Sequence, residues 1–197
     1  MYTKSILSFI AIATLSACGG SSTGPASFTT ASSQAAFDAT SQKGLALIEQ
    51  YGDAAATTEM PVSGTANYSG VAGFSDVPDV SPENIFTVAD VAMTASFNAT
   101  GGSINGSMTN FLDSDSDNGQ VQAIGGSLGI SDGVITGNSF TASVSGTLTA
   151  GNDTVEISGG MNGEFVGDNA AALRAGIDIV DSVANERFYG ALIAEKQ

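Results

Sequence analysis

The chain of 197 residues carries 20 acidic and 5 basic side chains, which gives it a formal net charge of −15. This charge opposes binding to nucleic acid, because such binding depends on Lys and Arg neutralising phosphates, and it disfavours electrostatic adhesion to anionic lipid. The sequence contains no His. It therefore lacks the usual proton shuttle near neutral pH, an imidazole metal ligand and the base of a Ser-His-Asp or Cys-His unit. We predict a protein that is not an enzyme and holds no cofactor.

The N-terminus has the outline of a secretory signal over residues 1–17. Lys4 precedes an apolar run over residues 6–15, and small residues lead to Cys18, the one cysteine of the chain. The run is shorter than the ~20 apolar residues that span a bilayer. Leu15-Ser16-Ala17-Cys18 resembles the bacterial lipobox, whose cysteine sulfur receives a diacylglycerol and becomes the first residue of the mature protein. The alternative is an ordinary secreted protein with a free thiol.

Lipid attachment at Cys18 would place the protein on a membrane of a Gram-negative envelope. Two or more acyl chains hold a protein firmly, whereas one chain does so only marginally. Gly19 follows the cysteine, where lipoproteins kept at the inner membrane commonly have aspartate. We therefore expect an outer-membrane lipoprotein, exposed at the cell surface, whose mature chain has no disulfide bond.

Residues 18–31 are rich in Gly, Ser, Thr and Ala, a composition typical of a flexible tether. The next segment, residues 32–59, begins with a helical pattern over residues 32–51. Phe37, Leu45, Ile48 and Tyr51 are near helical spacing, with polar residues between them. Gly44 weakens this pattern, because a helix-interior glycine costs ~1 kcal/mol relative to alanine. We expect a short amphipathic helix that covers the outside or one end of the domain.

Residues 60–197 have the pattern of an all-β domain, in which larger apolar residues alternate with small or polar ones. The expected strands are 65–72, 90–98, 103–111, 121–130, 139–149, 154–161, 173–180 and 187–195. Turn signals separate them at residues 100–102, 113–119, 132–133, 151–153 and 167–169. About eight short strands without helical crossovers indicate an antiparallel sandwich or barrel.

The glycines inside these strands favour a barrel, because glycine permits the bends that closure requires. Closure also removes exposed edges, and the interior of an eight-stranded barrel is filled by side chains. We predict that the core contains the larger apolar strand residues, namely Met93, Phe97, Met108, Phe111, Phe140 and Phe165.

Four stretches resemble the β-barrel domain of transferrin-binding protein B and related surface lipoproteins. Residues 60–70 are similar to its opening strand, and Phe97 with residues 103–108 to its second hairpin. Residues 163–170 resemble its Gly-x-Phe-Tyr-Gly-Pro-x-Ala signature, although Val166 and Asp168 replace the tyrosine and the proline. Residues 188–191 resemble its last strand. The resemblance implies a lipid-anchored receptor or adhesin that binds a host or environmental protein, often in iron or haem acquisition or in immune evasion.

Two acidic segments are candidates for binding. In the first, Asp113, Asp115 and Asp117 alternate along a loop and could offer oxygen ligands to Ca²⁺. However, Asn118 and Ile124 stand where an EF-hand has Gly and Glu, so a solvated hairpin loop is the main alternative.

The second segment contains Asp76, Asp79 and Glu83 together with two prolines, which favour an exposed loop. Two acidic loops at one end of a barrel would form a negative rim that attracts a basic partner. The alternative is that these acids only keep the surface soluble.

Other chemical sites receive less support. Asp153 and Glu156 could form a glycosidase pair, but a three-residue spacing on a strand places them on opposite faces. The glycine pairs lack the context of a phosphate loop, and haem would need a tyrosine ligand because His is absent. The leading hypothesis is a surface receptor or adhesin, followed by an accessory envelope lipoprotein without a specific ligand. A carrier with a small ligand in or at the mouth of the barrel is the third.

Overall fold

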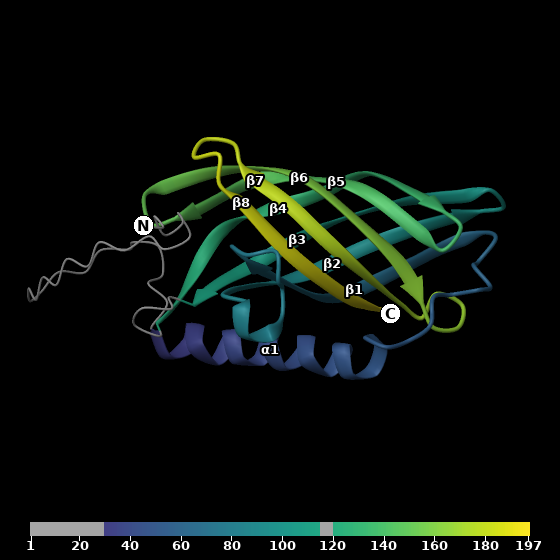
Figure 1. The fold of residues 1–197 in the computed structure, drawn as a ribbon, viewed down its shortest axis with the longest axis horizontal. Helices are drawn as coiled ribbons and strands as arrows, with labels where there is room; N and C mark the ends of the chain where they lie inside the picture. Colours follow the sequence, from purple (N-terminus) through teal and green to yellow (C-terminus); the bar gives the residue numbers. More distant parts are fainter. Residues whose placement is uncertain (1–29, 115–119) are drawn as a thin grey trace, which may run out of the picture.

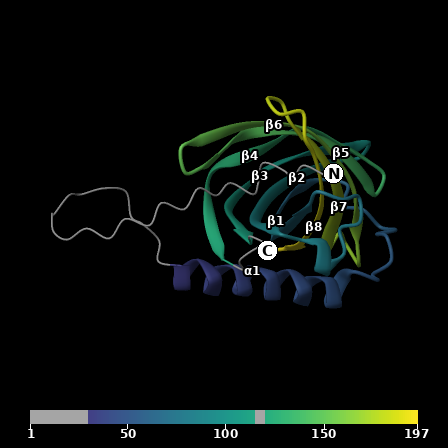
Figure 2. The same cartoon turned by 60° about the vertical axis from the view of Figure 1, so that its left-hand side comes forward.

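The computed structural model describes residues 30–114 and 120–197. It shows a closed barrel of eight antiparallel strands in sequence order, with one helix on its outside (Figures 1 and 2). The elements are α1 (Thr30–Tyr51), β1 (Gly64–Ser75), the short helix η1 (Pro82–Asn84), β2 (Thr87–Asn98), β3 (Gly101–Ser114), β4 (Val121–Thr136), β5 (Ser139–Ala150), β6 (Asp153–Val166), β7 (Ala172–Asp181) and β8 (Arg187–Lys196). The predicted fold class is confirmed. The predicted boundaries at residues 17, 31 and 59 remain predictions.

Pairing of β1 with β8 closes the barrel. Tyr68 is opposite Lys196, and Ser75 is opposite Tyr189. At this seam Gly70 faces Ala194, and a Cβ atom on Gly70 would lie 2.5 Å from the Ala194 Cα atom. Glycine is therefore needed where these two strands meet, because it allows their close approach. The sequence predicts a different role for strand glycines, which is to permit bends.

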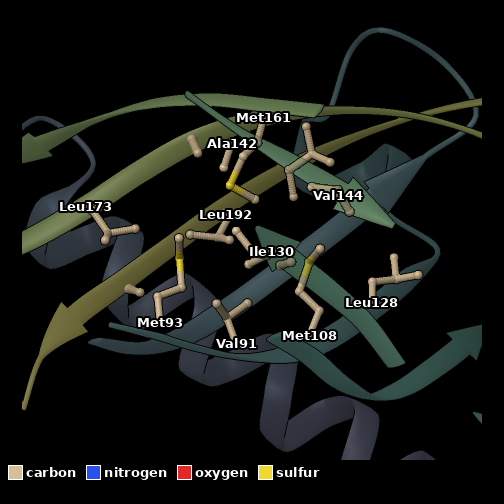
Figure 3. Close-up of a cluster of buried hydrophobic side chains, with 14 of the residues drawn as sticks. Val91, Met93, Met108, Leu128, Ile130, Ala142, Val144, Met161, Leu173 and Leu192 are labelled. Carbon is tan, nitrogen blue, oxygen red and sulfur yellow. The ribbon is translucent and has the colours of Figure 1, made fainter. Parts of the chain in front are cut away.

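The interior of the barrel is packed with side chains from alternate strand positions. The six predicted core residues are confirmed, because each is at most 7% exposed. Three methionines, Met93, Met108 and Met161, extend into the same cluster from β2, β3 and β6 (Figure 3). At one end, Tyr68 and Phe97 pack against Phe165, with ring centroids 5.8 and 5.6 Å apart. Side chains therefore fill the interior of the barrel, which is not an open channel.

One predicted turn is wrong. Residues 132–133 lie inside β4 as a bulge, where the pairing with β5 shifts between Ser131 and Val134 and Asp132 adopts a φ of 53°. The turn that ends β4 is instead at Gly137, which has a φ of 61°. A bulge and a turn use the same residue types, Asp and Gly in the left-handed region, so composition alone does not distinguish them.

The predicted helix is confirmed, and it lies along the outer wall of the barrel rather than across an end (Figure 2). Its inner face lies over β1, where a Cβ atom added to Gly44 would be 3.5 Å from Val71 Cγ1. Phe37 packs against a separate outer cluster of Val88, Leu112 and Val121. Within the described part of the chain, no helix has the length and apolar character needed to cross a membrane.

Candidate functional site

Among the described residues, side chains fill the interior of the barrel and leave little space for a ligand. A void of about 30 Å³ lies near one end, among side chains that include Phe74, Phe111 and Phe188. A buried water needs roughly 10–15 Å³ by this kind of measure, so the void could hold only a water or two. The third hypothesis from the sequence is a carrier with a small ligand inside the barrel or at its mouth. The packed core does not fit a ligand inside the barrel, and it does not bear on a site at the mouth.

A groove of about 900 Å³ lies between α1 and the barrel wall. On the helix side, lining residues recur about once per turn from Phe37 through Ser41 and Leu45 to Ile48. Leu45 and Ile48 are 51% and 48% exposed, so apolar side chains line the groove without being covered. Its volume is within the range of ~300–1,000 Å³ that is usual for small-molecule sites.

The floor of the groove is a row of small residues that the strand register brings together. Gly176 of β7 is opposite Ala191 of β8, and Ala191 is opposite Gly73 of β1. These positions alternate with inward-facing residues, so they point away from the core. Nothing lies within 4 Å of the position that a Cβ atom of Gly176 would occupy. The floor is therefore open at Gly176.

An ion pair lies at the end of the groove near the C-terminus of α1. The Arg174 Nε and Nη2 atoms donate to Glu164 Oε1 at 2.9 and 2.7 Å, and Nη1 donates to the carbonyl oxygen of Gly52. Both charged side chains are about one-third exposed. Arg174 thus links the residue after α1 to the barrel wall, and the pair leaves this end of the groove without net charge.

The two acidic segments lie at the same end of the barrel. Phe74 is opposite Thr87, and Thr87 is opposite Asp113, so the β1–β2 and β3–β4 connections leave the barrel side by side. Asp76, Asp79 and Glu83 are exposed, as expected. Asp115 and Asp117 lie outside the described residues.

Asp113 is placed differently from the expectation of a solvated loop. It belongs to β3, is only 2% exposed and accepts a hydrogen bond from Thr87 Oγ1 at 2.6 Å. The cause is a bulge at Asn110, where φ is 55° and the pairing with β4 shifts. The bulge changes the alternation, so that Phe111 and Asp113 face inward.

The described ranges contain no cluster suited to a metal ion. No three His, Cys, Asp or Glu side chains gather there in a way that could hold a metal ion. Asp153 and Glu156 are both exposed. The groove was missed by the sequence analysis, although glycines inside strands are a signal for close approach of a ligand or backbone.

Comparison with known proteins adds little. No protein-family model matches the chain, and no curated protein matches it in sequence. The chain is similar to crystal structures of a mutant and a double mutant of the vaccine antigen Transferrin Binding Protein B from Haemophilus parasuis Hp5. TM-scores are 0.41 and 0.42, and identities are 18% and 22%. The matches cover 73% of this chain but only 28% of each of those chains, and we draw no functional conclusion from them.

Proposed function

We propose that this protein is a lipid-anchored outer-membrane protein that binds another protein through the surface of its barrel and catalyses no reaction. The packed interior is the observation that supports this function, because a void of about 30 Å³ leaves the outer surface as the place for recognition. Rigid scaffolds that carry loops are common among binding proteins. The resemblance noted in the sequence directs the first partner screen to host iron-carrying and haem-carrying proteins.

The anchor is proposed at Cys18, which lies outside the described residues. Mass spectrometry of the membrane fraction should find a diacylglyceryl-modified N-terminal cysteine, and a Cys18→Ala variant should be released from membranes. An unmodified N-terminus, or a Cys18→Ala variant that still sediments with membranes, contradicts the anchor. Neither result depends on the identity of the partner.

The partner is proposed to approach the acidic end of the barrel. Asp76, Asp79 and Glu83 are exposed there, and Asp115 and Asp117 belong by sequence to the neighbouring connection. Asp113 is excluded from this surface because it is buried. Clustered charge increases the association rate of an oppositely charged protein, and salt screens the effect over ~10 Å at 0.1 M ionic strength.

A matched pair of triple variants tests this surface. The rim variant replaces Asp76, Asp79 and Glu83 by Asn, Asn and Gln, whereas the control makes the same changes at Asp53, Asp168 and Glu59, which are also exposed. The control residues are at the opposite end of the barrel, where Gly167 N donates to Ala55 O. We expect the rim variant alone to associate more slowly with an isolated partner, with a weaker dependence on salt. Equal effects of the two variants would mean that net charge, and not the rim, attracts the partner.

Protease treatment of intact cells separates a receptor from an accessory envelope lipoprotein. A surface receptor should be degraded on whole cells without lysis. Complete protection, with degradation only after the outer membrane is opened, would favour the accessory function and overturn the receptor.

A further inference from the structure

The groove between α1 and the barrel wall has a shape suited to one narrow, apolar occupant. Its lining on the helix runs from Phe37 to Gly52, a length of about 22 Å at 1.5 Å per residue. Its floor is formed by Gly176, Ala191 and Gly73 on three adjacent strands. It is open at Gly176, whereas the side chain of Ile85 covers Gly73. A long, thin and apolar molecule can lie on such a floor beside the helix.

The two ends of the groove differ in polarity. Near the β1–β2 connection the lining is apolar and includes Val80, Pro82 and Ile85. Near the C-terminus of α1 it includes Ser139 and Asn162 beside the Arg174–Glu164 pair. An occupant that satisfies both ends has an apolar tail and a polar head.

The charges specify the head further. Arg174 and Glu164 neutralise each other at a distance of 2.7 Å, so neither an anion nor a cation finds an unpaired opposite charge there. The net charge of −15 also repels anions. Ser139 and Asn162 offer neutral hydrogen-bonding groups instead.

From these observations we propose that the groove binds a single-chain amphiphile with an uncharged head, of the monoacylglycerol type. The tail lies over Gly176 and Ala191 against Leu45 and Ile48, and the head lies beside Asn162 and Ser139. This site is separate from the acidic end of the barrel and does not depend on the protein partner proposed there.

The test uses a series of monoacylglycerols titrated into the full-length Cys18→Ala protein below their critical micelle concentrations, with binding measured by calorimetry. We expect saturable binding of one molecule per chain. Affinity should rise about fourfold per added methylene until the groove is full. Fatty acids and alkylammonium ions with the same chain should bind more weakly. If none of these amphiphiles bound, the proposal would be overturned. That result is also the one expected if the true occupant of the groove is a protein segment.

A matched pair of glycine variants locates the binding. Gly176→Leu fills the open floor, and it fits because nothing lies within 4 Å of the added Cβ. Gly129→Leu is the control, because Gly129 is an exposed strand glycine outside the groove whose Cβ would be 3.6 Å from Ser145 O. We expect Gly176→Leu to weaken binding by about tenfold or more and Gly129→Leu to leave it unchanged.

Equal affinities in the two variants would place the ligand elsewhere and overturn the proposal, as would preferential binding of a charged amphiphile. Circular dichroism and melting temperatures of both variants establish that each is folded before titration.

Discussion

Replacing Gly70 by alanine tests whether the barrel closes as described. Gly70 faces inward on β1 and is opposite Ala194 of β8. An added Cβ atom would lie 2.0 Å from the Ile193 carbonyl oxygen, 2.5 Å from the Ala194 Cα atom and 2.6 Å from its Cβ atom. Two of these three atoms belong to the backbone, so a change of side-chain rotamer cannot relieve the overlap. The two strands must separate at the seam.

The expected loss of stability follows from this geometry. Overpacking of a core costs ~1–3 kcal/mol, occasionally more, and backbone overlap places Gly70→Ala near the upper end, at about 3 kcal/mol. For a protein of this size each kcal/mol lowers the melting temperature by about 2–4 °C, so we expect a decrease of about 6–12 °C. Thermal unfolding followed by far-UV circular dichroism measures it.

Gly176→Ala is the matched control, because it makes the same substitution on a neighbouring strand where nothing lies within 4 Å of the new Cβ atom. We expect its melting temperature to remain within about 2 °C of the parent protein, since surface substitutions usually change stability by less than ~0.5 kcal/mol. If Gly70→Ala melted as high as Gly176→Ala, β1 and β8 would not approach each other as the closed barrel requires, and the argument from the seam would be refuted.

Three further predictions concern the same fold. A chain ending at Asn185 lacks β8 and leaves one edge of β1 and one edge of β7 unpaired, so we expect it to unfold. A cooperative melting transition in this fragment would contradict closure. Thr87→Val removes the 2.6 Å hydrogen bond to the buried Asp113 carboxylate, and it should cost about 1–3 kcal/mol in urea unfolding, whereas Thr94→Val at an exposed hydrogen bond should cost less. Burial raises the pKa of Tyr68 to about 12, above its unfolded value near 10, so the unfolded state loses this proton first and stability falls as the pH rises from about 10 to 12. Tyr68→Phe, which also loses the 2.9 Å hydrogen bond to Ala170 O, should lack this component of the alkaline decrease; an identical decrease in both proteins would count against the assignment.

The strands could be predicted from sequence because one face of each is buried in a single core. Alternation of apolar and small or polar residues is the direct consequence of that burial, and it is clear in β2 and β5, whose burial patterns alternate almost throughout. Alternation fails at the bulges. Asn110 and Asp132 each adopt positive φ and change which face of the strand the following residues occupy. Asp113 therefore points inward, although the acidic segment that it begins has the composition of a loop.

The groove could not be predicted in this way, because its floor joins residues that are distant in the chain. Gly73, Gly176 and Ala191 become neighbours only through the pairing of β7 with β8 and of β8 with β1. Strand register depends on the whole hydrophobic pattern and on the connections, and a shift of two residues in β8 would preserve its inward face but separate this row. The helix adds the second side of the groove, and its position against the wall depends on tertiary packing such as that of Phe37 against Val88, Leu112 and Val121.

A glycine within a strand can therefore have either of two structural roles, which the sequence alone does not distinguish. At Gly70 the neighbouring strand occupies the place of a side chain, and the absence of a Cβ atom allows the barrel to close. At Gly176 the same place is empty, and the absence of a Cβ atom leaves an open floor beside exposed Leu45 and Ile48. Backbone packing explains the first glycine but not the second. An empty position bordered by uncovered apolar side chains leaves apolar surface that a ligand could bury, and for this reason we assign the groove, rather than the glycine-rich strands in general, to binding.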